Sequence, residues 1–457
     1  MYRRVAMARR LTTISRPLAL LALVTLVSLG LRIALIDEPC RAPCRTANDH
    51  LLVFDEVYYV NAARVIAGIT PPADQKYRDA PLGDDPNSEH PQLVKVLMAG
   101  SIELFGDTPF AWRLPSLLLG TIAIVAMFAL VRAAGGSEWL GLIAATLMAA
   151  DNLVLVHGRI GTLDVPVLAL MLGAAIAYLR GRPLLAGILI GIGTAMKLVA
   201  PYLLAVVVLL ELLRALPSLR RGTGVVGREV ADVVRSAARR LGWCVSGAAV
   251  TLLGLLGLLD RLAPPYDPVA MQRLGGSPLT HLSHMLSYGA DQTSPHGPTG
   301  IASYPWDWLV DLKPITYLNI NPDKPAPGLF HVHPASHFLG VISPAIMLLA
   351  LPSLVFLAWA VLARLWRAPT AGEVRAEGEV PVLALAWFLG TFLPFVGLSI
   401  VFNRTSYLYY MVVVMPGIYL AVSDVLMRLR RHWPWLALWS VALVGSLVVL
   451  YPFTPLP

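Results

Sequence analysis

Two adjacent acidic residues, Asp55 and Glu56, lead a run of helical composition that extends over residues 54–64. A carboxylate at the start of such a run can take a proton from a hydroxyl group during a reaction. It can equally cap the helix, because Asp is a favoured N-cap residue and Glu suits the positive end of the helix dipole. The pair is therefore a catalytic candidate, with helix capping as the alternative.

Five basic residues stand at or near the ends of apolar runs: Lys95, Arg113, Arg159, Lys197 and Arg404. Arg and Lys are the side chains that bind phosphate best, and charges at a membrane edge are functional candidates. A lone arginine such as Arg113 can instead reach toward lipid headgroups. If the five side chains converge, they form a binding site for one anion.

Five further residues accompany these groups as site candidates: Glu89, His90, Asp164, Trp306 and Trp308. The two tryptophans belong to a polar segment that could line an acceptor groove. The same segment holds five histidines that could ligate a metal ion: His281, His284, His331, His333 and His337. Histidines in a wet aromatic loop more often hydrogen-bond or stack, so no metal site is predicted.

The elements that must position these residues are membrane helices. The chain has 457 residues, of which 56% are apolar and 14% charged, and its mean hydropathy is +0.66. Soluble domains contain about 25% charged residues, so an ordinary soluble enzyme is excluded. The net charge of +8 comes from short basic blocks between apolar runs, which suit membrane lipids and the rule for membrane insertion. Membrane lipids are therefore the expected partners, and nucleic acid is not.

Eleven apolar runs are candidate crossings: 18–36, 113–132, 139–156, 163–179, 184–196, 198–213, 242–259, 339–363, 380–401, 407–427 and 434–451. They predict an all-α polytopic membrane protein with about eleven transmembrane helices. Residues 92–105 are too short to cross, since 14 residues rise only about 21 Å as a helix. They are predicted to form an amphipathic helix on the outer surface, within the first large loop. Glycines and Pro201 interrupt 184–213, which predicts two short spans or a re-entrant hairpin with Lys197 at its tip.

The distribution of Lys and Arg predicts the orientation. Basic residues concentrate in the segments that lie inside when the N-terminus is inside. The predicted parts are an inner tail with the first helix (1–36), an extracytoplasmic loop (37–112), helices 2–7 (113–259), a second extracytoplasmic loop (260–338) and helices 8–11 (339–457). The strong preference for Arg over Lys points to a GC-rich genome, and so to a prokaryotic plasma membrane. Cys40 and Cys44 in the first loop could form a disulfide or remain free thiols.

Seven motifs occur in an order that resembles the protein O-mannosyltransferase family: FDEVYY, EHPQLVK, WRLPSLLLG, GRIGTLD, GIGTAMK, SYPWDWLV and NRTSYLYY. The family belongs to the polyprenyl-phosphate-sugar-dependent glycosyltransferases with multispanning folds of the GT-C type. The resemblance covers residues 50–420. It implies polyprenyl-phosphate-mannose as the lipid-linked donor, with no other cofactor, and a hydroxyl acceptor on protein Ser or Thr.

The resemblance also implies roles for individual residues. Asp55 corresponds to the general base, and Glu56 organises the site beside it. Lys95, Arg113 and Lys197 correspond to positions near the lipid phosphate. Gln92 departs from the family's His-Pro-Pro-Leu pattern, which weakens the inference of a protein acceptor.

The chemistry is consistent with these residue types. A polyprenyl phosphate leaves with negative charge that Arg and Lys can stabilise, while a carboxylate takes the proton of the acceptor hydroxyl. A single displacement would invert the anomeric centre. Transfer of another pentose or hexose to a lipid or cell-envelope glycan is the first alternative. A membrane transporter is the second, since a broken helix pair such as 184–213 occurs at transporter sites.

Overall fold

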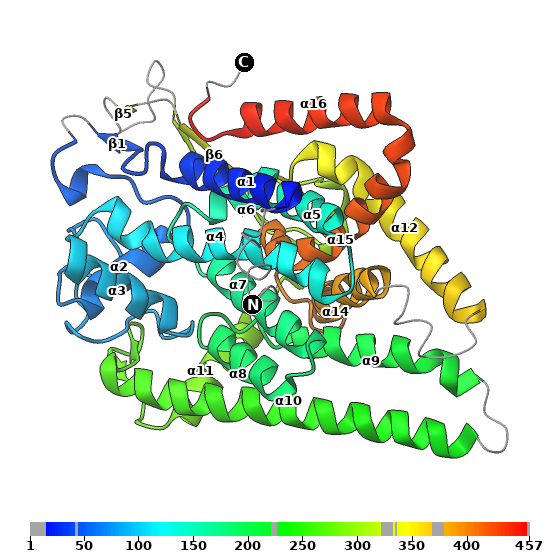
Figure 1. Cartoon of the computed structure of the whole chain (residues 1–457). Helices are drawn as coiled ribbons and strands as arrows, with labels where there is room; N and C mark the ends of the chain where they lie inside the picture. Colours follow the sequence, from blue (N-terminus) through cyan, green and yellow to red (C-terminus); the bar gives the residue numbers. More distant parts are fainter. Residues whose placement is uncertain are drawn as a thin grey trace, which may run out of the picture.

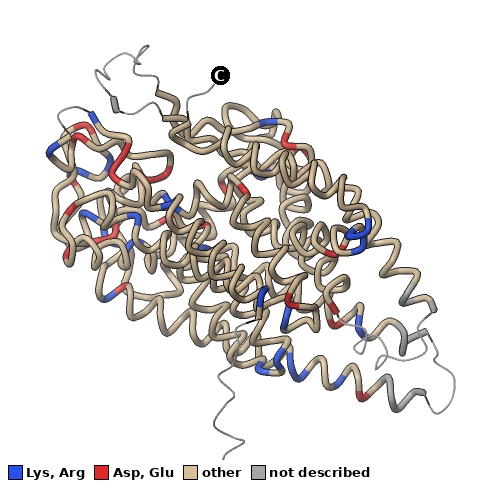
Figure 2. Tube along the Cα trace, turned by 45° about the horizontal axis from the view of Figure 1, so that its top comes forward, with Lys and Arg blue, Asp and Glu red and all other residues tan. Residues whose placement is uncertain are grey.

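The computed structural model describes residues 15–41, 44–220, 226–320, 332–333, 336–367 and 379–454. Most of them are helical. Long helices run side by side, while α2 (Glu56–Ile66), α3 (Leu93–Phe105) and α11 (Pro278–Asp291) gather at one end of the bundle (Figure 1). Charged residues lie mainly toward the two ends of the molecule, with a largely uncharged middle (Figure 2). This distribution suits a bundle that crosses a hydrocarbon layer.

The bundle helices are α1 (Arg16–Ile33), α4 (Pro109–Ala133), α5 (Glu138–Ala150), α6 (Asn152–His157), α7 (Asp164–Leu179), α8 (Pro183–Thr194), α9 (Tyr202–Arg220), α10 (Val226–Leu262), α12 (Pro344–Arg367), α14 (Val380–Phe402), α15 (Met411–Arg428) and α16 (Trp433–Leu450). Each predicted crossing overlaps one of these helices, which confirms the polytopic all-α class. Among the described residues, 7 helices are long and apolar enough to span a membrane, so the number eleven stays a prediction.

The predicted single crossing over 139–156 is two helices. Asp151 ends α5 and caps α6, because its side chain accepts a hydrogen bond from the backbone N–H of Leu153. The same carboxylate accepts a hydrogen bond from the backbone N–H of Ser343. A buried acidic cap therefore divides this run, which hydrophobicity alone does not reveal.

The predicted amphipathic helix over 92–105 is present as α3. It packs against α2 and α4, with Val94, Met98 and Ile102 buried and Leu104 and Phe105 exposed. It is not among the candidate membrane spans. The one-sided burial of its apolar residues is that of an amphipathic helix.

The interrupted run 184–213 forms α8 and α9, joined by a turn that contains Lys197, as predicted for its tip. α8 packs mainly against α7 and α10, and α9 against α14. Glycines bring α8 and α10 into backbone contact: a Cβ atom at Gly187 would lie 2.1 Å from the carbonyl oxygen of Cys244. Such close packing through small residues is common between membrane helices.

In the described part of the chain, the two segments outside the bundle contain short strands that the all-α prediction missed: one before α2 and five after α10. β4 (Ile315–Ile320) pairs antiparallel with β6 (Ser336–Gly340), from Ile315 opposite Gly340 to Ile320 opposite Ser336. β2 (Tyr266–Asp267) pairs with β3 (Gln272–Arg273), and β1 (Cys40–Arg41) with β5 (Val332–His333). The 3-10 helices η2 (Pro305–Val310) and η3 (Leu408–Tyr410) complete the surroundings of the site.

Candidate active site

Asp55 directly precedes α2, in a turn shaped by the residue before it. Phe54 has a φ of +56°, an uncommon backbone conformation for a bulky side chain. Its ring stacks on Tyr317 of β4 at 4.1 Å and meets Tyr409 of η3 edge-on at 5.4 Å. Packing against these two rings holds the turn in place and thereby fixes the direction of Asp55.

The Asp55 carboxylate occupies the N-cap position of α2 but makes no capping hydrogen bond. It has no hydrogen bond or ion pair with any described residue, and the side chain is part-exposed. Burial raises the pKa of Asp55 to about 7; the charge of Lys197 lowers this pKa and that of Asp164 raises it. The geometry does not support the capping alternative. It leaves a carboxyl group that can exchange a proton near neutral pH.

The carboxylate of Glu56, in contrast, is bound by several hydrogen-bond donors. It accepts hydrogen bonds from the backbone N–H groups of Val53 (2.8 Å) and Gly161 (2.7 Å). Arg113 donates to both carboxylate oxygens, from Nε at 2.8 Å and Nη2 at 2.9 Å. Glu56 therefore joins the turn before α2 to α4 and to the loop before α7; its organising role in catalysis stays a prediction.

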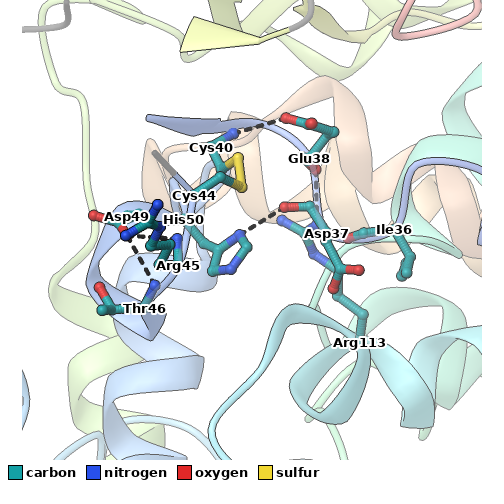
Figure 3. The surroundings of a disulfide bond; sticks show 10 residues. All are labelled: Ile36, Asp37, Glu38, Cys40, Cys44, Arg45, Thr46, Asp49, His50 and Arg113. Carbon is teal, nitrogen blue, oxygen red and sulfur yellow. Dashed lines mark hydrogen bonds between the residues drawn. A yellow bond between two sulfur atoms is a disulfide. The ribbon is translucent and has the colours of Figure 1, made fainter. Parts of the chain in front are cut away.

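Arg113 ties this group to the first outer segment. Its Nη1 donates to the carbonyl oxygens of Ile36 (2.5 Å) and Glu38 (2.9 Å) (Figure 3). Cys40 and Cys44 beside them are joined by a disulfide, which settles the alternative that the sequence left open. Arg113 is thus buried between a carboxylate and two carbonyl groups. It does not face lipid headgroups.

Arg113→Gln is expected to lower the free energy of unfolding by about 3–5 kcal/mol, because it leaves the buried carboxylate of Glu56 without its cation. The measurement is thermal or denaturant unfolding of the purified protein in detergent. The matched control is Arg428→Gln, which removes an exposed ion pair with Asp424 and should cost about 0–1 kcal/mol. Equal stability of the two variants would contradict the structural role of Arg113.

A cavity of about 470 Å³ is lined by residues of α9, α11 and α14 and of the turn between α8 and α9. Its polar lining consists of Glu89, His90, Asp164, Lys197 and Arg404. Its apolar and aromatic lining includes Leu198, Val199, Tyr202, Met285, Leu286, Tyr288, Phe395, Leu398, Phe402, Tyr410 and Val413. The cavity therefore has the two-sided character that an amphiphilic ligand with a polar head and an apolar chain requires.

Lys197 is held on one side of this cavity. Its Nζ lies 2.5 Å from Oδ1 of Asp164, the first residue of α7, and above the rings of Tyr409 and Tyr410 at 5.2 and 5.5 Å. Oδ2 of Asp164 lies 3.6 Å from Nδ1 of His157. Lys197 and Asp164, predicted in separate loops, thus form one ion pair at the cavity.

Arg404 lines the cavity from the segment after α14. That helix ends at Asn403, which has a φ of +49° and turns the chain so that Arg404 follows outside the helix. The guanidinium has no hydrogen bond or ion pair with any described residue. Arg404 is therefore a cation available to an anionic ligand.

The predicted convergence of five basic groups is not observed, because three of the five are buried elsewhere. Lys95 lies 2.6 Å from Asp85 and donates to two backbone carbonyls. Arg159 donates to the carbonyls of Ala34 (2.9 Å) and Leu35 (3.1 Å) and lies over the ring of Phe453. Arg113 is bound as described above. The structure thus brings Lys197 and Arg404 to the cavity and uses the other three cations to join segments.

The two candidate tryptophans do not share a groove. Trp308 is fully buried, where its Nε1–H donates to Oγ of Ser303 at 2.9 Å and its ring packs against Phe395. Trp306 is 43% exposed and stacks on Tyr304. Residues two apart in a 3-10 helix point in different directions. One ring is buried and the other exposed, so their proposed common role in acceptor binding is not supported.

Glu89 and His90 do line the cavity, as two of the additional candidates. Burial lowers the pKa of His90 to about 3, with further lowering by Lys95, Lys197 and Arg404, so the imidazole is neutral. Its ring meets Tyr59 and Tyr288 edge-on. Sequence reasoning missed Tyr202 and Tyr288. The tyrosine run 407–410 was quoted only as a motif, yet Tyr410 lines the cavity and Tyr409 packs against Lys197.

Comparison with solved structures defines the fold class. The chain aligns with the S. cerevisiae protein O-mannosyltransferase Pmt1-Pmt2 complex bound to the sugar donor, with a TM-score of 0.65, 13% identity, and coverage of 97% of this chain and 90% of that chain. It also aligns with ArnT from Cupriavidus metallidurans bound to undecaprenyl phosphate, with a TM-score of 0.53, 16% identity, and coverage of 94% and 64%. The protein therefore has the multispanning GT-C fold of these structures.

Sequence comparison then points to one family within that class. Residues 89–221 match the model of the dolichyl-phosphate-mannose-protein mannosyltransferase family. A polyprenol-phosphate-mannose–protein mannosyltransferase of Corynebacterium glutamicum is 38% identical over 91 residues, which are 20% of this chain and 18% of that protein. These matches confirm the resemblance drawn from the motifs. Together with the apolar helices, they identify the chain as an integral membrane protein.

Proposed function

We propose that the protein transfers a sugar from a polyprenyl-phosphate donor to the hydroxyl group of a Ser or Thr in a protein, and that this sugar is mannose. The observation that carries this proposal is a cavity that combines an apolar lining with Arg404, a cation that pairs with no described residue. It is joined by Asp55, a carboxylate without a hydrogen bond or ion pair to any described residue, whose pKa burial raises and the charge of the cavity residue Lys197 lowers. The names of the matching relatives support mannose and a protein acceptor.

The donor fits the two-sided cavity. The polar side, with Arg404 and Lys197, would hold the phosphate, since guanidinium and ammonium groups bind phosphate oxygens strongly. The apolar side would receive the first isoprene units of the chain. As the bond from sugar to phosphate breaks, the leaving phosphate gains negative charge, and these two cations stabilise that charge.

The acceptor hydroxyl would give its proton to Asp55 while its oxygen attacks the anomeric carbon of the sugar. The electron pair of the broken bond leaves with the polyprenyl phosphate. A single displacement of this kind inverts the anomeric centre, so that a β-linked mannosyl phosphate would yield an α-mannoside. Glu56 would hold the turn that carries Asp55 and would not touch the substrate.

The transfer rate is expected to depend on pH through the base. A general base acts in its deprotonated form, which is the minor form of Asp55 below its pKa of about 7. The initial rate at saturating donor should therefore rise about tenfold per pH unit below pH 7 and level off above it. His90 stays neutral over this range because its pKa is lowered to about 3. A rate that does not change between about pH 5 and pH 8 would argue against Asp55 as the base.

The proposal is tested with purified protein, radiolabelled polyprenyl-phosphate-mannose, and separate panels of Ser/Thr peptides and glycolipids. Label in the peptides supports the proposal. Label only in glycolipids, or only with another lipid-linked sugar, would replace it by the alternative of glycan transfer. Release of donor without any product, together with solute uptake in vesicles, would favour the transporter alternative.

We further infer that the cavity faces the extracytoplasmic side, as the basic residues predict. Cysteines introduced at the exposed positions Asp79 and Gln272 should react with a membrane-impermeant maleimide in intact cells. A cysteine at the exposed His432 should react only after permeabilisation. Background labelling should be low because Cys244 is buried and Cys40 is bonded to Cys44. The reverse labelling pattern would invert the orientation.

A further inference from the structure

A second cavity, of about 900 Å³, lies between the start of α8 and the middle of α10. It is separate from the first, because α8 lies between them. Arg182, directly before α8, lines the second cavity, while Lys197, directly after α8, lines the first. A helix of 12 residues is about 18 Å long, so the two cavities lie at opposite ends of α8.

The second cavity is strongly basic. Four arginines line it, Arg182, Arg235, Arg239 and Arg240, against one acidic residue, Asp232. Arg235 pairs with Asp232 at 3.2 Å, and Arg240 pairs with Glu211 at 2.5 Å.

The other two arginines, Arg182 and Arg239, are unpaired. Both are exposed, and neither guanidinium has a hydrogen bond or ion pair with any described residue. The cavity therefore keeps two exposed positive charges that no carboxylate of a described residue pairs with.

Beside these charges the lining is apolar. Leu184, Leu185 and Ile188 project from the first turns of α8, and Trp243 projects from α10 with 52% of its surface exposed. Arginine and tryptophan are the residues that anchor membrane proteins at the boundary between headgroups and hydrocarbon. A ligand that satisfies both parts has an anionic head and apolar chains.

The packing of the two helices explains why the cavity is held open. α8 and α10 touch through their backbones at Gly187 and Gly247, where added Cβ atoms would lie 2.1 Å from Cys244 O and 2.9 Å from Leu184 O. This contact occurs next to the cavity and fixes the distance between the helices. The long side chains of Arg182 and Arg239 then bound a space that neither helix fills.

We propose that this cavity binds the phosphate headgroup of an anionic phospholipid from the surrounding membrane. Basic pockets between membrane helices are suited to such headgroups. The unpaired charges of Arg182 and Arg239 supply the complementarity. The leucines and Trp243 beside them favour a lipid over a soluble anion, which has no apolar part to contact them. The proposal concerns a different site from the transfer reaction and does not depend on the proposed function.

The test measures lipid binding to the purified full chain by native mass spectrometry, with phosphatidylglycerol and phosphatidylcholine as probes. The wild-type chain should bind phosphatidylglycerol selectively. The double variant Arg182→Gln/Arg239→Gln should lose about tenfold or more in affinity for phosphatidylglycerol, because each charge near a lipid surface contributes on the order of 1 kcal/mol. The matched control Arg430→Gln/Arg431→Gln removes two exposed arginines beside α16 and should change the affinity less than about twofold.

A third variant separates charge from folding. Arg182→Lys/Arg239→Lys keeps both charges and should retain most of the phosphatidylglycerol binding. Loss of binding in the lysine variant as well as in the glutamine variant would show that the arginines act through local structure, and would overturn the proposal. Equal loss in the control variant would reduce the effect to general surface charge. Displacement of the lipid by millimolar inorganic phosphate would show a soluble-anion site instead.

Discussion

Asp55→Asn is expected to lower the rate of sugar transfer by about a hundredfold to ten-thousandfold, because loss of a positioned general base has an effect of this size. The amide cannot take the proton of the acceptor hydroxyl. It has nearly the same shape as the carboxylate, so the ring contacts of Phe54 that hold the turn should remain. The measurement is the turnover of radiolabelled donor with a Ser/Thr peptide at saturating concentrations of both.

Folding and donor binding should be unchanged in this variant. The Asp55 carboxylate makes no capping hydrogen bond and no ion pair with a described residue, so its replacement removes no stabilising contact. Donor binding of Asp55→Asn should therefore match wild type, and its thermal stability should be at least that of wild type, because burial disfavours the charged form of Asp55. The control variant is Asp79→Asn, which removes an exposed carboxylate from the same outer segment and should retain full turnover. An Asp55→Asn protein with more than about a tenth of wild-type turnover would move the search for the base to Glu89 and Asp164.

The helix-forming segments and the location of the acidic pair could be predicted from the sequence, because both depend on local patterns. Apolar runs of sufficient length gave helices at every predicted crossing, and Asp55 does precede α2. Which of the two carboxylates, Asp55 or Glu56, is bound by other groups could not be predicted. Glu56 is occupied by Arg113 and by the backbone of Gly161, which are 57 and 105 residues away in the chain. Nothing in the local sequence distinguishes the free carboxylate from the bound one.

The roles of the basic residues were harder to predict for the same reason. Lys95, Arg113 and Arg159 resemble Lys197 and Arg404 in sequence, since all five lie beside apolar runs. The structure separates them by their partners. Lys95 and Arg159 are held by a carboxylate or backbone carbonyls of other segments, and such contacts have no sequence signature. A cation is available to a ligand where the fold leaves its donors unused, and the guanidinium of Arg404 has no hydrogen bond or ion pair with a described residue.

The missed strands have a related cause. β4 and β6 pair residues that are about twenty positions apart, and the strands have 6 and 5 residues. Segments this short give no clear alternation of polar and apolar residues against an apolar background. Tyr317 of β4 nevertheless supports the turn at Asp55, because it stacks on Phe54 and hydrogen-bonds His157 at 2.7 Å. Part of the site is therefore built by β4, a strand that the amino-acid composition of its segment does not predict.

Arg404→Gln is expected to weaken donor binding by about 2–5 kcal/mol, which is roughly a thirtyfold to several-thousandfold change in affinity, if the guanidinium meets the lipid phosphate away from water. Lys197 shares its charge with Asp164 at 2.5 Å, whereas Arg404 has no such partner among the described residues. Removal of Arg404 therefore removes from the cavity a positive charge that no ion pair with a described residue neutralises. The measurement is equilibrium binding of polyprenyl-phosphate-mannose to the purified protein.

The control for this variant is Arg261→Gln, at the end of α10 that approaches α11. Arg261 is exposed and does not line the cavity, and its guanidinium has no hydrogen bond or ion pair with a described residue. The Arg261→Gln variant removes the same charge from the same end of the bundle, so its donor binding measures the effect of net charge alone. The folding stability of Arg404→Gln should be close to that of wild type, because the guanidinium has no hydrogen bond or ion pair with a described residue that the change would break.

Two outcomes would contradict the prediction. If both variants bind donor as tightly as wild type, the lipid phosphate is held outside the cavity. If both weaken equally, long-range attraction explains the effect, and Arg404 is not a ligand of the phosphate.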